Sequence, residues 1–164
     1  MEIERKYSVA VLPKDLSQYR YKKIEQGYLC HNPTVRIRKC NEDFILTYKS
    51  KLGLMPIGEN GPSVNHEVEL PLTAEAYLTL KNKTDGNLIY KTRYLIPIND
   101  ALTAELDLFE GLLEGLRIVE VEFPDLESAD KFTPPVWFGK DLSSDKRFTN
   151  YHLSRLSSLF ELDL

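Results

Sequence analysis

The first residues of the chain combine acidic and basic side chains in the pattern Glu2-x-Glu4-x-Lys6. Successive side chains of a β-strand point to opposite faces, so these three would share one face, opposite Ile3 and Tyr7. Two adjacent carboxylates repel each other unless a cation lies between them, and their oxygens suit a hard ion such as Mg²⁺ or Mn²⁺. The lysine beyond them offers a positive charge to a phosphate bound by the same metal. A solvated strand face would show the same short pattern, so this motif alone does not distinguish such a face from a metal and phosphate site.

Six further segments place two charged residues two positions apart, in most cases with apolar residues between them. They are Arg36/Arg38, Lys49/Lys51, Glu67/Glu69, Lys91/Arg93, Glu105/Asp107 and Glu120/Glu122. With 28% of the residues charged, a given position and its second neighbour are both charged only about one time in twelve. Seven such pairs, counting Glu2/Glu4, are therefore unlikely to be accidental and indicate strand faces with a common role.

These pairs lie in segments that the alternation and the turn residues predict to be β-strands. The predicted strands cover residues 2–9, 21–30, 34–40, 44–50, 66–70, 88–96, 103–109 and 116–123. Helices are predicted near 14–19, 73–83, 125–132 and 149–160. The segment 52–65 reads as a long loop, and 136–145 as irregular structure.

One face of such a sheet must be buried, and the apolar face is the candidate. We therefore predict a mainly β, α+β fold in which eight antiparallel strands close into a barrel, with the charged faces inward and the helices packed on the outside. A lumen with acidic and basic rows requires water, metal and a polyanion, because buried charges without partners are costly.

Composition limits the class of protein. A chain of 164 residues with 42% hydrophobic residues is expected to form one domain, residues 1–164. The net charge of −4 argues against a nucleic-acid duplex as partner. The charged start and the lack of a long apolar run predict neither a signal peptide nor a membrane span. Two cysteines, Cys30 and Cys40, are expected to be reduced thiols in a cytoplasmic protein, and the three scattered histidines show no zinc-type spacing.

Together these motifs, with Gln26-Gly27-Tyr28-Leu29, Lys91-Thr92-Arg93-Tyr94 and the segment Asp145-Lys146-Arg147-Phe148-Thr149-Asn150, resemble the CYTH superfamily of triphosphate tunnel metalloenzymes. The resemblance spans essentially the whole chain. It implies an eight-stranded tunnel that acts on a triphosphate, such as inorganic tripolyphosphate, thiamine triphosphate, a nucleotide or an RNA 5′ end. One branch of the superfamily is the class IV adenylate cyclases.

The resemblance also implies a role for each charged row. Triphosphate would be bound by Lys6, Arg36, Arg38, Lys49, Lys91 and Arg93. A Mg²⁺ or Mn²⁺ ion would be held by Glu2, Glu4, Glu120 and Glu122, and a second metal or the attacking water by Glu67, Glu69, Glu105 and Asp107. These assignments agree with the chemistry of phosphoryl transfer, which depends on positioning and on neutralisation of charge.

The resemblance further suggests a general base. In some small tripolyphosphatases a tyrosine at the position of Tyr28 is proposed to act with the lysine that matches Lys91. A nearby ammonium would favour the tyrosinate form. The other interpretation is that Tyr28 only lines or packs against the wall.

The predicted function is a metal-dependent triphosphatase, with inorganic tripolyphosphate as the leading substrate. Two alternatives stay open: a class IV-type adenylate cyclase that converts ATP to cyclic AMP, and a module that binds polyphosphate or nucleotide without turnover. Similar proteins are often homodimers, but the sequence does not determine the oligomeric state.

Overall fold

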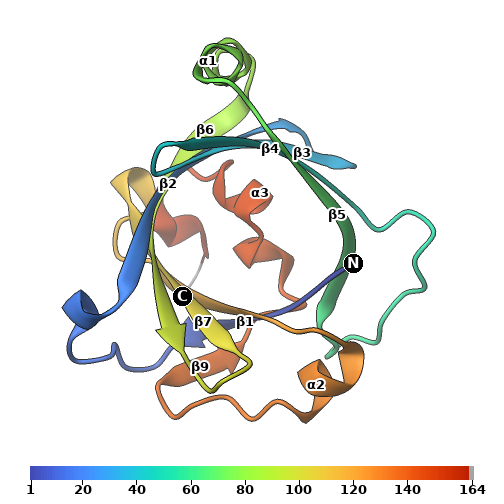
Figure 1. Cartoon of the computed structure of the whole chain (residues 1–164), viewed down its shortest axis with the longest axis vertical. Helices are drawn as coiled ribbons and strands as arrows, with labels where there is room; N and C mark the ends of the chain where they lie inside the picture. The colour runs from blue at the N-terminus through green and yellow to red at the C-terminus, as the bar shows by residue number, and fades with distance from the viewer. Residues whose placement is uncertain (163–164) are drawn as a thin grey trace.

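The computed structural model describes residues 1–162, and its main element is one sheet of nine β-strands. The strands are β1 (Glu2–Val9), β2 (Arg20–Cys30), β3 (Thr34–Cys40), β4 (Asp43–Ser50), β5 (Ser63–Pro71), β6 (Asp85–Pro97), β7 (Thr103–Glu110), β8 (Arg117–Glu122) and β9 (Phe138–Asp141). Their spatial order is β5-β4-β3-β2-β6-β7-β8-β1, and β1 pairs with β5 to close the ring (Figure 1). The predicted closed barrel of eight antiparallel strands is therefore confirmed.

The barrel closes through a short seam. One edge of β1 pairs with β8 from Glu4 to Ser8, but the other edge pairs with β5 only from Glu2 to Glu4. Further along this edge, Tyr7 and Val9 pair with β9. The prediction of irregular structure at 136–145 is thus wrong for Phe138–Asp141, which form β9. This segment has no alternating pattern, and it becomes a strand because β1 presents a free edge for pairing.

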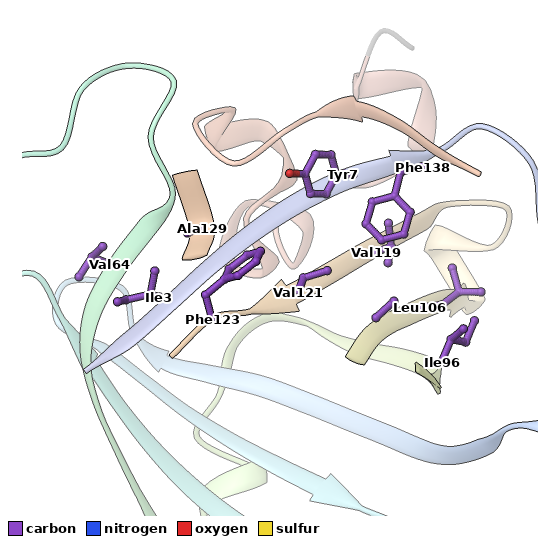
Figure 2. Packing of buried hydrophobic residues seen from close by; sticks show 11 residues of the cluster. Ile3, Tyr7, Val64, Ile96, Leu106, Val119, Val121, Phe123, Ala129 and Phe138 are labelled. Atoms are coloured by element: carbon purple, nitrogen blue, oxygen red, sulfur yellow. The ribbon is translucent and has the colours of Figure 1, made fainter. Parts of the chain in front are cut away.

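An apolar layer covers the outside of β1, β7 and β8. Ile3, Tyr7 and Val121 project outward and pack with Phe138 of β9 and Ala129 of α2 (Leu126–Lys131), as Figure 2 shows. The rings of Tyr7 and Phe138 are 5.1 Å apart between centroids. Burial of this face stabilises the barrel wall and leaves the opposite faces of the strands pointing into the lumen.

A second outer helix, α1 (Ala74–Lys81), contacts β3 and β4. It begins at Thr73, whose hydroxyl accepts a hydrogen bond from the backbone N–H of Ala76, as an N-terminal cap does. Its buried Tyr77 lies 5.0 Å from the ring of Phe44 between centroids. The helix predicted at 73–83 therefore covers the outer face as expected.

The C-terminal segment differs from the prediction. In place of an outer helix at 149–160, it forms α3 (Asn150–Leu153) and a 3₁₀ turn (Leu159–Leu162). The Ser154 hydroxyl donates to the carbonyl of Tyr151 at 2.6 Å, and serines that bond locally in this way disfavour a continuing helix. Seen along the barrel, α3 lies within the ring of strands (Figure 1).

This segment closes one end of the lumen. Its apolar side chains form a buried cluster with inward-facing residues of the strands; the cluster includes Phe148, Leu153, Leu156 and Leu162 on one side and Tyr28, Ile89, Phe109 and Ile118 on the other. The physical reason for the difference is that the inward rows of β2, β6, β7 and β8 end in these apolar or aromatic residues, so this end of the barrel needs an apolar cover.

Smaller differences lie at the element boundaries. The helix predicted near 14–19 is a 3₁₀ turn (Leu16–Gln18), and further 3₁₀ turns span Gly111–Leu113 and Lys146–Phe148. Strand β5 begins at Ser63, inside the predicted loop. In residues 1–162 no helix has the length and apolar character needed to cross a membrane.

Candidate active site

The inward faces of the strands enclose a cavity of about 360 Å³, called the tunnel below. Twelve of its sixteen lining residues are charged: Glu2, Glu4, Glu67, Glu69, Glu105, Glu120, Glu122, Lys22, Arg36, Arg38, Lys49 and Arg93. The other four are Ile24, Cys40, Ile45 and Asn150. Because acids outnumber bases by two, the tunnel needs additional positive charge before it can hold a polyanion.

The tunnel brings together most of the predicted site residues, and four of them lie outside its lining. Tyr28, Lys91 and Asp107 are almost fully buried and are not among the residues that line the cavity. Lys6 lines a neighbouring cavity of about 50 Å³, which shares Glu4 with the tunnel.

Carboxylates hold four of the six predicted phosphate-binding cations: Arg93, Lys6 and Lys49, and also Lys91, which pairs with Asp107. Arg93 donates to Asp107 through Nε at 2.7 Å and Nη2 at 2.8 Å, to Glu120 at 2.9 Å, and also contacts Glu105. Lys6 Nζ lies 3.2 Å from Glu120, and Lys49 Nζ lies 2.8 Å from Glu2. These carboxylates neutralise much of the positive charge of their partners.

The titration of Glu120 reflects these contacts. Burial opposes ionisation, but the charges of Lys6 and Arg93 outweigh it and hold the pKa of Glu120 well below its ordinary range. The same balance, with Arg93 and Lys91 opposing burial, lowers the pKa of Asp107. Both acids are therefore carboxylates at neutral pH.

Arg36 and Arg38 are different, because their partners are uncharged. Arg38 Nε donates to Oε1 of Gln26 at 3.0 Å, and Arg36 Nη2 donates to the Thr47 hydroxyl at 3.3 Å. In the described part of the chain, neither arginine forms an ion pair with a carboxylate. Burial, together with the charges of Arg36 and Arg93, lowers the pKa of Arg38 to about 10. Of the predicted phosphate-binding cations that line the tunnel, these two guanidinium groups are the ones without an ion pair in residues 1–162.

Three glutamates of the opposite wall are crowded together. Burial raises the pKa of Glu4, and Glu120 and Glu2 add to the rise, while Lys49 opposes it. Burial also raises the pKa of Glu2 and of Glu122, the latter with the charges of Glu105, Glu67 and Glu4. One buried oxygen, Glu2 Oε2, accepts no hydrogen bond although it lies 2.8 Å from Lys49 Nζ. Lys49 lies 2.8 Å from Glu2 and 4.0 Å from Glu4, but its charge does not outweigh the burial of these two carboxyl groups. Additional positive charge at this wall would stabilise the carboxylates.

The donor set fits a hard divalent ion. Only carboxylate oxygens are available on this wall, and they suit Mg²⁺ or Mn²⁺ better than a softer metal. No group of three acidic, histidine or cysteine side chains in residues 1–162 is arranged to hold a metal ion. Water or substrate oxygens would have to complete the coordination, which is the usual arrangement for magnesium.

Lys91 is fully buried and has an acidic partner. Its Nζ lies 2.5 Å from Oδ2 of Asp107 and 5.3 Å from the centroid of the Phe109 ring. Burial and the charges of Arg93 and Arg38 outweigh the attraction of Asp107 and lower the pKa of Lys91 to about 8. The lysine can therefore exchange a proton near neutral pH, although it does not face the tunnel.

Tyr28 lies at the closed end of the tunnel, and only 3% of it is exposed. Its hydroxyl accepts a hydrogen bond from Nε2 of Gln26 at 3.4 Å and interacts with the guanidinium of Arg36. Its ring meets that of Tyr151 edge to face, with 5.7 Å between centroids. Within residues 1–162, Tyr28 and Lys91 share no hydrogen bond, so the cation next to this tyrosine is Arg36.

Comparison with known proteins places this tunnel in a family. The chain is 35% identical over 157 residues to an inorganic triphosphatase of Nitrosomonas europaea, a match that covers 93% of this chain and 96% of that protein. It is 30% identical over 161 residues to an inorganic triphosphatase of Acetivibrio thermocellus, covering 93% and 92%. The chain belongs to the CYTH-like inorganic triphosphatase family. No protein-family model matches the chain.

A solved structure supports the membership in this triphosphatase family. The crystal structure of an inorganic triphosphatase superposes on the chain with a TM-score of 0.68 at 32% identity, covering 96% of this chain and 97% of that one. The two chains thus share a fold, and the resemblance recognised in the sequence motifs is confirmed.

Sequence reasoning missed several residues of this triphosphatase tunnel. Lys22 lines it, and the alternation Lys22-x-Ile24-x-Gln26 in β2 would have placed it on the inward face. Asn150 lines it from α3. No local pattern predicts this position of Asn150, because it depends on α3 lying within the ring of strands and not on the outside of the barrel.

Proposed function

We propose that the protein hydrolyses inorganic tripolyphosphate to pyrophosphate and orthophosphate. The observation that supports this most is the pair Arg36 and Arg38: two guanidinium groups that line the tunnel and form no ion pair with a carboxylate of residues 1–162. Guanidinium groups bind phosphate oxygens with paired hydrogen bonds and cannot lose their charge near neutral pH.

In this proposal several cations together bind the triphosphate and neutralise its charge. Arg36 and Arg38 bind the phosphate oxygens directly, and Lys49 and Arg93 add positive charge from the other lining rows. Lys6 contributes from the neighbouring small cavity. Stabilisation of charge by a fixed set of donors is the main means of accelerating phosphoryl transfer.

We further propose a Mg²⁺ or Mn²⁺ ion at the acidic wall. Glu2, Glu4, Glu120 and Glu122 would hold it, and Glu67, Glu69 and Glu105 would hold a second ion or the attacking water. Asp107 is assigned to the same group, although Arg93 and Lys91 already occupy its oxygens. The ion supplies positive charge, which a tunnel with more acids than bases lacks when it binds a polyanion.

The test is to incubate the purified protein with tripolyphosphate, ATP or thiamine triphosphate in Mg²⁺ or Mn²⁺, and to measure orthophosphate, pyrophosphate and cyclic AMP. Orthophosphate from tripolyphosphate, at a higher kcat/KM than from the other two, is the expected result. Cyclic AMP from ATP would point to the cyclase alternative, and binding without product to a binding module. The cytoplasmic location and the homodimer stay predictions.

We propose Tyr28 as the general base. It lies at the closed end of the tunnel beside the guanidinium of Arg36, and as the tyrosinate it would take the proton of the attacking water. Lys91 keeps a place in this proposal as the residue that binds Asp107, which in turn orients Arg93 in the lining.

Tyr28→Phe should fold normally, bind tripolyphosphate about as well as the wild type, and lose about 100-fold in kcat, the typical contribution of a general base. Steady-state kinetics and thermal shift measure the two effects. Tyr151→Phe is the matched control, because it removes a hydroxyl from the neighbouring ring and should keep its kcat. Wild-type turnover in Tyr28→Phe would leave Tyr28 a packing residue and shift the base role to a water held by Glu67 or Glu69.

Asn150→Ala should weaken tripolyphosphate binding by about tenfold, the usual loss for one hydrogen bond to a charged group. Asn150 reaches the tunnel from α3, so its amide can donate to a phosphate at the closed end. Asn150→Asp should be worse than alanine, because it adds an acid to a wall already short of positive charge. Binding is measured by titration calorimetry, and an unchanged Kd in both variants would remove Asn150 from the site.

A further inference from the structure

Gln26 is a fully buried amide on the inward row of β2, between Ile24 and Tyr28. Buried amides are costly unless their polar atoms are paired. Both ends of this one are paired: Oε1 accepts from Arg38 Nε at 3.0 Å, and Nε2 donates to the Tyr28 hydroxyl at 3.4 Å. Gln26 therefore links an arginine of the tunnel to the tyrosine at its closed end.

The contact leaves Arg38 ready for a ligand. Because Gln26 occupies Nε, the two terminal nitrogens of the guanidinium stay available toward the tunnel that Arg38 lines. The amide carries no net charge, so it fixes the side chain without cancelling its positive charge. Arg93, in contrast, contacts three carboxylates.

The same arrangement holds the neighbouring arginine. Arg36 contacts Thr47, which is also fully buried and uncharged. Four cations of the lining thus form two classes: acids hold Arg93 and Lys49, and neutral side chains hold Arg36 and Arg38. No ion pair with a carboxylate of residues 1–162 offsets the charge of the second class.

We propose that Gln26 is a positioning residue, which holds Arg38 in the orientation that binds the triphosphate and leaves its positive charge unpaired. A carboxylate at position 26 would pair with Arg38, so the amide is what allows this site to bind an anion. This inference rests on the proposed function. It goes beyond it by naming a residue that touches no substrate and yet sets the strength of substrate binding.

The decisive variant is Gln26→Glu. The introduced carboxylate keeps the length of the side chain, can still accept from Arg38 and forms a new ion pair with it. We expect the ligand-free protein to have a higher melting temperature than the wild type. At the same time KM for tripolyphosphate should rise at least tenfold, and the tripolyphosphate-induced shift in melting temperature should shrink. A purely structural role would not move stability and binding in opposite directions.

Two further variants complete the experiment. Gln26→Met matches the shape without either hydrogen bond, and it should raise KM less than Gln26→Glu because Arg38 keeps its charge. In an Arg38→Ala background, Gln26→Glu should no longer raise the melting temperature, since the coupling between the two residues is gone.

The proposal is overturned if Gln26→Glu lowers the ligand-free melting temperature, or if both Gln26 variants keep the wild-type KM. The ligand-free measurements stand whether or not tripolyphosphate is the substrate. Failure of the wild type to bind or hydrolyse tripolyphosphate would therefore refute the proposed function, while the melting temperatures would still decide how Gln26 holds Arg38.

Discussion

Replacing Arg38 with alanine is expected to lower kcat/KM for tripolyphosphate by about 100-fold or more while leaving the barrel folded. Arg38 lines the tunnel as a cation without a carboxylate partner in residues 1–162, and a charge-assisted contact to phosphate is worth about 3 kcal/mol. The melting temperature should stay near that of the wild type. Relief of the repulsion from Arg36 and Arg93 offsets the loss of the hydrogen bond to Gln26.

Lys39→Ala is the matched control. It removes the same charge from the adjacent position of β3, but Lys39 does not line the tunnel, and its Nζ lies 5.9 Å from the centroid of Phe44. Tripolyphosphate should raise the melting temperature of the wild type and of Lys39→Ala equally, and that of Arg38→Ala much less. Equal shifts in all three proteins would contradict a substrate-binding role for Arg38.

Removal of divalent metal is expected to abolish turnover. Activity should vanish in EDTA and return with Mg²⁺ or Mn²⁺, because seven acidic and five basic side chains in the lining leave the tunnel unable to neutralise a polyanion. Glu4→Gln keeps the shape of the side chain but removes one charged ligand, and it should lose at least about 100-fold in kcat/KM.

A measurement without substrate separates metal binding from catalysis. Mn²⁺ should raise the melting temperature of the wild type by mass action, and that of Glu4→Gln less. Glu127→Gln, which alters an exposed glutamate of α2 paired with Lys131, should behave as the wild type does. Full activity of Glu4→Gln in the presence of metal would refute the metal assignment at this wall.

The two predictions test different walls of the tunnel. Arg38 belongs to the row held by neutral partners, and Glu4 to the crowded acids whose pKa values burial raises. If both variants kept wild-type activity, the proposed triphosphatase site would be refuted. If only one of them did, the wall that carries that residue would be the one assigned wrongly.

Much of the barrel could be predicted because the relevant signal is local. The alternation of Arg36-Ile37-Arg38 or Glu120-Val121-Glu122 follows from the two-residue period of a strand, so it appears in the sequence whatever the partners are. The eight strands and the inward direction of their charged rows were accessible for this reason. Strand β9 was not, since Phe138–Asp141 has no such alternation and depends on the free edge of β1.

The C-terminal segment shows a second limit of the sequence. Leu153 and Leu156 have the spacing of an amphipathic helix, and that pattern says only that one face is buried. Whether this face lies against the outside of the barrel or closes its end depends on where the apolar residues of distant strands are, here Ile89, Phe109 and Ile118. Asn150 reached the tunnel only as a consequence of that placement.

The sequence by itself determined which residues are charged, which face of each strand they occupy, and that these faces meet in one lumen. The tertiary structure alone decided which charge neutralises which. Arg93 meets Glu120 across the intervening strand β7, and Lys49 meets Glu2 across β5, at separations of 27 and 47 residues. Arg36 meets Thr47 and Tyr28, and Arg38 meets Gln26, none of which carries the charge of a carboxylate. Such pairings depend on the stagger of strands around a closed barrel, which no local pattern encodes.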